Sequence, residues 1–293
     1  MMPATTPRDV EFLSLLYRLG FMTIEHAEIC VYGNHNVAQR RLSALETQGY
    51  LLSFPLSRGR KGQPTKVCFI NYKARQILSE MLQQELDGRH IPRTPPENAL
   101  VTWHTLELNS VLVAFIAAAK KEGYLFDFIP EYWSGAGPTN GSPLADEVQN
   151  PNGGRGMIRF RRDAVCCIGT QKGKALFELE YDRGKEAIIG GTYRKVTIAD
   201  KNAVFLQSVK ERRFERYAEP RFFNYPFKVS RLLLVTTSEE RLQNIAGVCR
   251  DLETHGLVYL TTMDQVRPET VLGPIWHVPD NGNVTIRSLV SYE

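Results

Sequence analysis

The stretch Asn34–Ile70 reads NHNVAQRRLSALETQGYLLSFPLSRGRKGQPTKVCFI. Its first half has the features of an α-helix: asparagines that favour a helix N-cap, then Val37, Leu42 and Leu45 at helical spacing. Gly49 follows, and glycine favours the left-handed conformation found just after a helix. We therefore predict a helix over about residues 34–49.

A β-hairpin is predicted directly after this helix. Leu51–Leu56 is a β-like run, Ser57–Pro64 is rich in glycine and basic residues, and Lys66–Ile70 is a second apolar run. Two such runs separated by Gly and Pro residues favour paired antiparallel strands with a turn between them.

Positive charge is concentrated in the same stretch. Between Gly33 and Lys66 there are six Lys or Arg residues and one acidic residue, Glu46, in a chain whose formal net charge is only +4. Positive charge gathered on one helix and one hairpin is typical of a protein that binds duplex DNA.

The polar residues of this helix are of types that hydrogen-bond base edges or phosphates from within a major groove. The basic residues of the hairpin would add sequence-independent phosphate contacts. The residues predicted to contact DNA are Asn36, Gln39, Arg40, Arg41, Arg58, Arg60 and Lys61. The alternative is an ordinary solvated helix face and turn.

The neighbouring segments have the order of a winged helix-turn-helix domain over residues 1–88. Helices are predicted at Arg8–Leu19 and Ile24–Tyr32 before the recognition helix, and at Lys73–Glu85 after the hairpin. The segment Leu86–Asn98 is rich in proline and polar residues, so it is predicted to be a linker.

An α/β domain is predicted over residues 99–293. Its expected elements are a helix at Leu100–Lys121, strands at Leu125–Pro130, Met157–Ile168 and Lys174–Asp182, a helix at Glu186–Tyr217, and then the strand Arg231–Thr236, the helix Ser238–His255 and the strand Leu257–Thr261. The stretch Ser134–Gly156 is expected to be a long loop. The final strand–helix–strand favours parallel pairing within an α/β sheet.

Acidic residues alternate along one of these strands. Glu178, Glu180 and Asp182 share one side of the strand because successive side chains point to opposite faces. Three like charges repel one another unless a divalent cation or a basic cluster offsets them. The preceding strand supplies Asp163.

These residues carry a resemblance. A helix, an Asp on one strand, an acidic doublet on the next, then a helix and a strand looks like the restriction-endonuclease-like, PD-(D/E)XK nuclease fold. The whole chain also resembles the plasmid replication-relaxation family, through the winged helix, the motif HTLELNSV at His104–Val111 and the motif LEYDRG at Leu179–Gly184. The resemblance implies an N-terminal winged helix followed by a nuclease-like domain, acting on plasmid or mobile-element DNA in replication or mobilisation, with a relaxase or a replication protein as an expected partner.

In active nucleases of this fold, an Asp and a Glu bind Mg²⁺, and a Lys two residues after the Glu helps to activate water. Carried over, Asp163 matches the Asp, and Glu178 or Glu180 matches the Glu. These three residues are the predicted catalytic and metal-binding residues if the domain is active, with Mg²⁺ as the implied cofactor. The lysine position is Glu180 or Asp182, which is acidic in either case, although Lys185 or Lys195 could replace it.

Three functions therefore stay open. The first is a double-stranded DNA-binding protein with a degenerate nuclease-like domain; the others are a Mg²⁺-dependent endonuclease and a winged-helix transcription regulator. A homodimer is expected because paired winged helices read two half-sites.

The sequence indicates a cytoplasmic protein that does not act at a membrane. The longest apolar run, Val111–Ala119, is too short to span a bilayer, and the N-terminus lacks the basic and apolar regions of a signal peptide. The five cysteines are scattered with no CxxC pair, so neither a zinc site nor a disulfide framework is expected.

Overall fold

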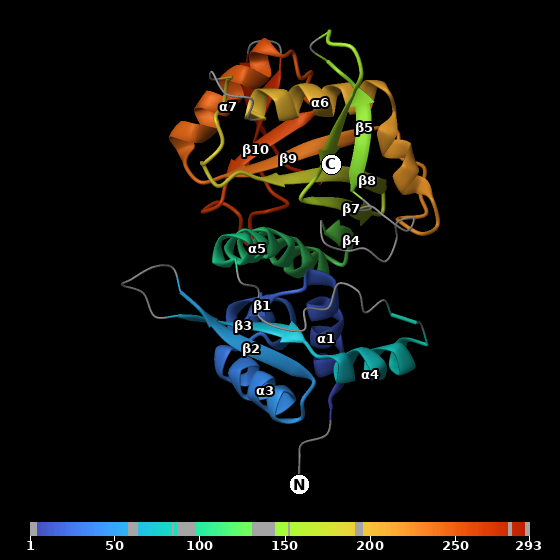
Figure 1. Cartoon of the computed structure of the whole chain (residues 1–293), viewed down its shortest axis with the longest axis vertical. Helices are drawn as coiled ribbons and strands as arrows, with labels where there is room; N and C mark the ends of the chain where they lie inside the picture. Colours follow the sequence, from blue (N-terminus) through green and yellow to red (C-terminus); the bar gives the residue numbers. More distant parts are fainter. Residues whose placement is uncertain are drawn as a thin grey trace. The chain divides into compact units, whose positions relative to one another are not determined.

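The computed structural model describes residues 5–57, 64–83, 85–86, 98–130, 144–151, 153–190, 196–280 and 283–290. These residues form two compact units (Figure 1), which divide between Ala117 and Ala118. The division therefore falls within helix α5 (Ala99–Glu122), and not at residues 89–98 between the two predicted domains.

The first unit contains helices and a small antiparallel sheet in which the strand order is β1-β3-β2. Its elements are α1 (Pro7–Leu19), β1 (Met22–Thr23), α2 (Ile24–Ala27) continued by the π-helical turn η1 (Glu28–Tyr32), α3 (His35–Thr47), β2 (Leu51–Leu56), β3 (Thr65–Ile70) and α4 (Tyr72–Leu82). The predicted hairpin is confirmed, with Leu51 paired to Ile70 and Leu56 paired to Thr65.

Side-chain caps begin helices α1 and α3 of this unit, and the asparagine cap of α3 was predicted. The Thr6 hydroxyl accepts a hydrogen bond from the Asp9 amide, and the Asp9 carboxylate accepts one from the Thr6 amide at 2.6 Å, so the pair forms a capping box. Asn34 caps α3, its Oδ1 accepting from the amide of Val37 at 3.1 Å. These bonds satisfy amides that have no partner within the helix.

The first part of α5 completes the core of the first unit. Trp103 and Leu106 pack against Leu56 and Val67. The buried side chain of Asn109 donates from Nδ2 to the carbonyl oxygens of Leu19 at 2.9 Å and of Phe21 at 2.7 Å, just beyond α1. Among the described helices, α5 alone is long and apolar enough to cross a membrane, but 56% of its most apolar window is buried inside the protein, as in the core helix of a soluble protein.

The second unit is built on a seven-stranded mixed sheet with the order β12-β11-β10-β9-β8-β7-β4. Its strands are β4 (Leu125–Pro130), β7 (Ala164–Thr170), β8 (Gly173–Tyr181), β9 (Ser230–Thr236), β10 (Val258–Thr262), β11 (Trp276–Asp280) and β12 (Asn283–Arg287). Strands β8, β9 and β10 are parallel to one another, and the remaining pairings are antiparallel. The predicted parallel pairing of β9 and β10 is confirmed, as is the general α/β class.

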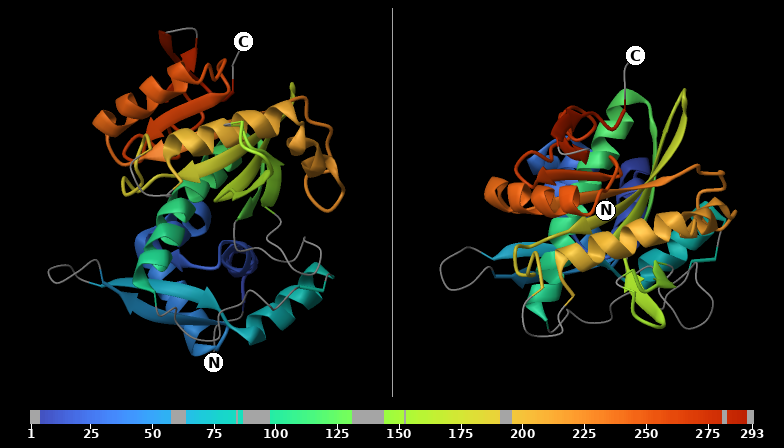
Figure 2. Two further views of the ribbon diagram at one scale, coloured as in Figure 1. Left: turned by 45° about the horizontal axis from the view of Figure 1, so that its top comes forward. Right: turned by 90° about the horizontal axis from the view of Figure 1, so that it is seen from above.

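Helices α6 (Ile198–Lys210) and α7 (Glu239–Asp251) lie side by side on one face of this sheet (Figure 1, Figure 2). They bury an apolar layer that includes Phe205 of α6 and Leu242 of α7, packed on Leu232 and Leu234 of β9. The face of the sheet that carries Leu232 and Leu234 is therefore enclosed by helices.

One predicted strand is wrong. Residues 157–168 form two strands in two sheets: β6 (Met157–Arg161) pairs with β5 (Ala145–Gln149) in a separate hairpin, and β7 begins at Ala164. The strand breaks at Arg162 and Asp163, where the Arg162 side chain enters the core. Strand β5 also lies within the stretch that was predicted to be a loop.

The predicted helix over residues 186–217 is confirmed only over residues 198–210. Residues 182–190 have no regular structure, α6 begins only after Thr197, which caps it, and the 3₁₀ turn η2 (Arg213–Ala218) follows it. The capping box of Thr197 and Asp200 sets the start of α6, which the apolar spacing alone does not indicate. Strands β11 and β12 were not predicted.

Candidate functional site

The outward face of α3 carries the polar residues that the helical spacing predicts. Ala38, Leu42 and Leu45 are buried. Asn36, Gln39, Arg40 and Ser43 are among the exposed residues on the other side of the helix. Three predicted DNA-contacting residues, Asn36, Gln39 and Arg40, therefore share one open helical surface.

Arg41 lies differently from its neighbour Arg40. Its Nε donates to Asp9 Oδ1 at 3.0 Å, its Nη2 also bonds to Asp9, and its side chain is only 15% exposed. Tyr32 donates its hydroxyl hydrogen to the same carboxylate at 2.9 Å. Burial raises the pKa of Asp9, but hydrogen bonds from Arg41 and Thr6 outweigh it and leave the pKa below its ordinary value. Arg41 thus joins α3 to α1, a use that the prediction of a DNA contact did not foresee.

The structure describes only some of the basic residues predicted on the hairpin beside α3. Arg58, Arg60 and Lys61 lie outside the described residues. Lys66 is paired with Glu46, with 2.6 Å between Nζ and Oε2, and Ser53 also donates to Glu46. Burial raises the pKa of Glu46, but the bonds from Lys66 and Ser53 outweigh this and lower it. The positive charge of Lys66, on β3, is therefore paired with the carboxylate of Glu46, on α3.

Glu178 and Glu180, two of the predicted acidic residues of the second unit, lie inside the protein, whereas Asp163 is half-buried. Glu178 and Glu180 are each 4% exposed, and β8 lies between β7 and β9. In the parallel register, Glu178 is opposite Leu232 and Glu180 is opposite Leu234. Because paired residues share a face, both carboxylates point into the layer beneath α6 and α7. The shared side of the strand was predicted correctly, and it faces the interior of the protein.

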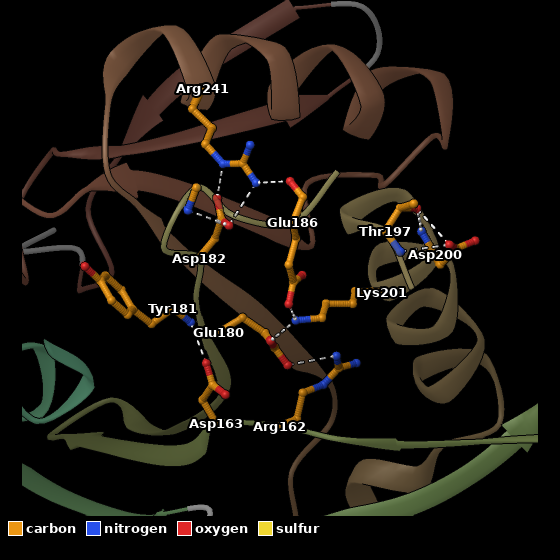
Figure 3. A network of polar contacts seen from close by, with 11 residues as sticks. Arg162, Asp163, Glu180, Tyr181, Asp182, Glu186, Thr197, Asp200, Lys201 and Arg241 are labelled. Atoms are coloured by element: carbon orange, nitrogen blue, oxygen red, sulfur yellow. Dashed lines mark hydrogen bonds and ion pairs between the residues drawn. The ribbon is translucent and has the colours of Figure 1, made fainter. Parts of the chain in front are cut away.

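Two basic side chains are paired with these carboxylates, and Figure 3 shows both of them beside Glu180. The buried guanidinium of Arg162 lies 2.6 Å from Glu178 (Nε to Oε2) and 3.4 Å from Glu180 (Nη1 to Oε1). Lys201, on α6, places its Nζ 3.3 Å from Oε2 of Glu180 and 2.9 Å from Oε1 of Glu186. The cluster thus links the β6–β7 junction, β8 and α6.

Asp163 lies at the end of this cluster. Its Oδ2 accepts a hydrogen bond from the backbone amide of Tyr181 at 2.7 Å. Burial and, next, the negative charge of Asp163 raise the pKa of Glu180 to about 7, against the opposing charges of Lys201 and Arg162. The structure therefore brings Asp163, Glu180 and a lysine together.

The lysine that reaches Glu180 is Lys201. Lys185 is exposed, and Lys195 lies outside the described residues. Lys201 follows Glu180 by 21 residues and meets it because α6 packs over β8. The spacing of residues in the sequence does not identify Lys201 as this lysine. It reaches Glu180 because α6 begins after Thr197, and that starting point determines which side of the helix faces the sheet.

The predicted ligands do not form a Mg²⁺ site in this arrangement. Among the described residues, no group of three or more His, Cys, Asp or Glu side chains has the geometry to hold a metal ion. The oxygens of Glu178 and Glu180 that face the cluster are bonded to Arg162 and Lys201. A hard divalent cation needs several of those oxygens at about 2–2.6 Å, so the guanidinium would have to leave first.

Asp182 forms a second ion pair where β8 ends. Its carboxylate is bonded to Arg241 of α7, with 2.9 Å between Nη2 and Oδ1, and accepts from the Thr236 hydroxyl at 2.9 Å and the Gly184 amide at 3.0 Å. Nη2 of Arg241 also donates to the backbone oxygen of Glu186 at 2.7 Å. The segment after β8 is therefore tied to α7 by Arg241 and to α6 by Lys201.

The arginines around η2 are largely paired with nearby acids. The ion pairs are Arg212–Glu215, Arg213–Glu211, Arg216–Asp146 and Arg221–Glu219. These exposed or half-exposed pairs contribute little net positive potential.

Comparisons of this chain with protein-family models, with curated proteins and with solved structures gave no match.

Proposed function

We propose that this chain is a cytoplasmic protein that binds double-stranded DNA, and that the first unit is a winged helix whose α3 enters the major groove. In this proposal it is a homodimer that serves plasmid or mobile-element replication or mobilisation, together with a relaxase or a replication protein. The second unit has a nuclease-like fold that has lost catalysis.

The exposed surface of α3 carries this proposal. Asn36, Gln39 and Arg40 are exposed on one side of a helix that is anchored on the other side by Leu42 and Leu45. The bonds between Arg41 and Asp9 hold α3 on α1. Amide and guanidinium groups on a fixed helix suit base edges and phosphates.

The proposal for the second unit is supported by topology and by the cluster on β8. Strands β4, β7 and β8 are antiparallel neighbours in chain order, and α6 connects β8 to the parallel strand β9. This is the order that the resemblance implies. Loss of catalysis is supported by Arg162, which occupies the carboxylates of Glu178 and Glu180.

The test is DNA binding as a function of salt, measured by fluorescence anisotropy with a labelled duplex of mixed sequence. Arg40→Ala removes one exposed cation, so the slope of log K against log[salt] should fall in magnitude by about 1. Arg267→Ala, an exposed arginine of the second unit, is the matched control and should leave the slope unchanged. Equal affinities and slopes for wild type and Arg40→Ala would remove the main support for the proposal.

A second candidate is a Mg²⁺-dependent endonuclease. The observation that favours it is the proximity of Asp163, Glu180 and Lys201, an acid pair and a lysine of the types that such enzymes use. Supercoiled plasmid incubated with the protein and Mg²⁺ or Mn²⁺ distinguishes the two functions. Nicking that disappears in Asp163→Ala supports the enzyme; intact plasmid, with duplex binding retained, supports the first proposal.

A further inference from the structure

Strand β12 forms one edge of the seven-stranded sheet, and among the described strands its neighbour is β11. Four of its five residues are exposed, including the apolar Ile286, whose exposed fraction is 59%. After β12 the chain stays beside the segment that leads into β11, because the Leu289 amide donates to the carbonyl oxygen of Leu272 at 3.1 Å. In the part of the chain that the structure describes, the outer side of β12 is therefore open.

The pairing with β11 determines which backbone groups of β12 face outward. In an antiparallel ladder, hydrogen-bonded pairs alternate with non-hydrogen-bonded pairs. Val284 is paired with Pro279, which has no amide hydrogen, so we assign this pair to the second kind. The amide and carbonyl groups of Val284 and, two residues later, of Ile286 then point away from β11 toward the open edge.

This edge lacks the features that usually prevent pairing with another strand. Proteins protect exposed edges with lysine, proline, a bulge or a covering segment. Strand β12 contains neither lysine nor proline, its register with β11 is continuous, and its one charged residue, Arg287, is at its end. The opposite edge strand, β4, is different, because its last three residues are buried and it ends at Pro130. Of the two edges, β12 is therefore the one suited to accept another strand.

The sequence of β12 is complementary to itself about Thr285. When two β12 strands pair antiparallel around this residue, Val284 of one copy lies opposite Ile286 of the other, and Asn283 lies opposite Arg287. The outward backbone groups of both copies then meet, and no like charges are opposite each other. Val284 packs against the apolar layer beneath α6 and α7. The exposed Ile286 of a second copy would therefore gain an apolar neighbour on that face of the sheet.

We infer that β12 pairs antiparallel with β12 of a second copy of this chain, on a twofold axis at Thr285, so that the sheets of the two copies join edge to edge. This inference rests on the proposed homodimer and assigns its contact to the second unit; it does not depend on what α3 binds. A strand of five residues forms an interface at the small end of the usual range. The dissociation constant is therefore expected to be on the order of micromolar.

The register is tested by disulfide formation between copies. Thr285→Cys places a thiol on the axis, in a non-hydrogen-bonded pair whose Cα atoms are about 4.5 Å apart, and a disulfide spans about 4.4–6.8 Å. The native cysteines are all buried, so oxidised Thr285→Cys should give a covalent dimer on a non-reducing gel and wild type should not. Asn283→Cys and Arg287→Cys should each crosslink poorly alone and well when mixed, because these positions lie opposite each other.

The interface is tested by sedimentation of the full chain across the micromolar range. Wild type should be in a concentration-dependent monomer–dimer equilibrium, and Ile286→Lys should be monomeric where wild type is dimeric, because a lysine on an edge opposes pairing. Leu125→Lys changes a residue of β4 that is 48% exposed, so it is the matched control and should behave as wild type. Thermal unfolding checks that each variant is folded, and if Ile286→Lys is not, the crosslinking decides.

Three outcomes would overturn the inference: monomeric wild type, a dimer that persists unchanged in Ile286→Lys, or Thr285→Cys that crosslinks no better than Asn283→Cys alone. A dimer that persists in Ile286→Lys leaves the proposed homodimer intact and moves its contact elsewhere. Binding of wild type to the labelled duplex is measured in parallel. A protein that dimerises through β12 and binds no duplex would contradict the DNA-binding proposal without affecting this inference, so the two failures are distinguishable.

Discussion

Acidification should destabilise the first unit through one buried histidine, His26. Its side chain is buried, Nδ1 accepts a hydrogen bond from the Thr23 amide at 3.4 Å, and Nε2 lies 2.8 Å from the Ser110 hydroxyl. With Nδ1 as acceptor, the neutral ring carries its hydrogen on Nε2. Burial lowers the pKa of His26 from 6.5 to about 4, against a smaller opposing effect of Glu25.

The size of the effect follows from the two pKa values. The unfolded chain binds a proton at His26 below pH 6.5, whereas the folded chain binds it only below about pH 4. Because the unfolded state holds more protons in this window, stability falls as the pH falls from 6.5 to 4. The contribution of His26 that is lost is roughly 2 kcal/mol at pH 5 and roughly 3 kcal/mol below pH 4. Typical domains have a total stability of about 5–15 kcal/mol, so the loss is large.

The measurement is hydrogen–deuterium exchange in urea, read on peptides from α1 and α3 at pH 7.5 and pH 5 and corrected for the intrinsic exchange rate. The free energy of opening measured in these helices should fall by the amount above. His26→Gln should be less stable at pH 7.5 and show a much smaller change between the two pH values. His35→Gln, an exposed histidine beside Glu28, is the control. An identical pH response in wild type and His26→Gln would refute the argument.

Two further substitutions test the contacts that hold each unit together. Asn109→Ala removes the side-chain donor to the carbonyl oxygens of Leu19 and Phe21 inside the first unit. In urea denaturation it should lower the free energy of unfolding of this unit by about 2–4 kcal/mol. Thr105→Ala, on the same helix, is the control and should have a much smaller effect. Asp182→Ala leaves Arg241 without its carboxylate, and should destabilise the second unit by about 3–5 kcal/mol and increase exchange in residues 182–190. Lys185→Ala, at an exposed residue of the same segment, is the control, and equal unfolding curves for Asp182→Ala and Lys185→Ala would contradict this role of the ion pair.

Local signals predicted most of the helices and strands within a few residues. Apolar spacing placed α1, capping asparagines together with apolar spacing placed α3, and alternating or apolar runs placed β4, β8 and β9. The errors fall where long-range contacts decide the backbone. The strand predicted over residues 157–168 breaks between β6 and β7, where Arg162 turns inward to bond Glu178. A residue that leaves a strand for a buried partner does not change the pattern of apolar and polar residues, so the sequence does not reveal the break.

The candidate DNA surface also has one part that the local sequence predicted and one part that a long-range contact decided. Helical spacing predicted that Asn36, Gln39 and Arg40 point outward, because exposure on an amphipathic helix follows from its apolar stripe. The next residue, Arg41, was predicted to contact DNA as well, but it is bonded to Asp9, 32 residues earlier in the chain. Nothing in the local sequence distinguishes the two arginines.

For the second unit, the sequence by itself determined that Glu178 and Glu180 share one side of a strand, since side chains alternate at every residue of β8. Only the tertiary structure decided that this side is enclosed, because it is the pairing with β9 and the packing of α6 and α7 that bury it. The tertiary structure also decided which basic side chains form ion pairs with the two glutamates. Arg162 and Lys201 are 16 and 21 residues away from their glutamates, and the sheet and the helix layer bring them together.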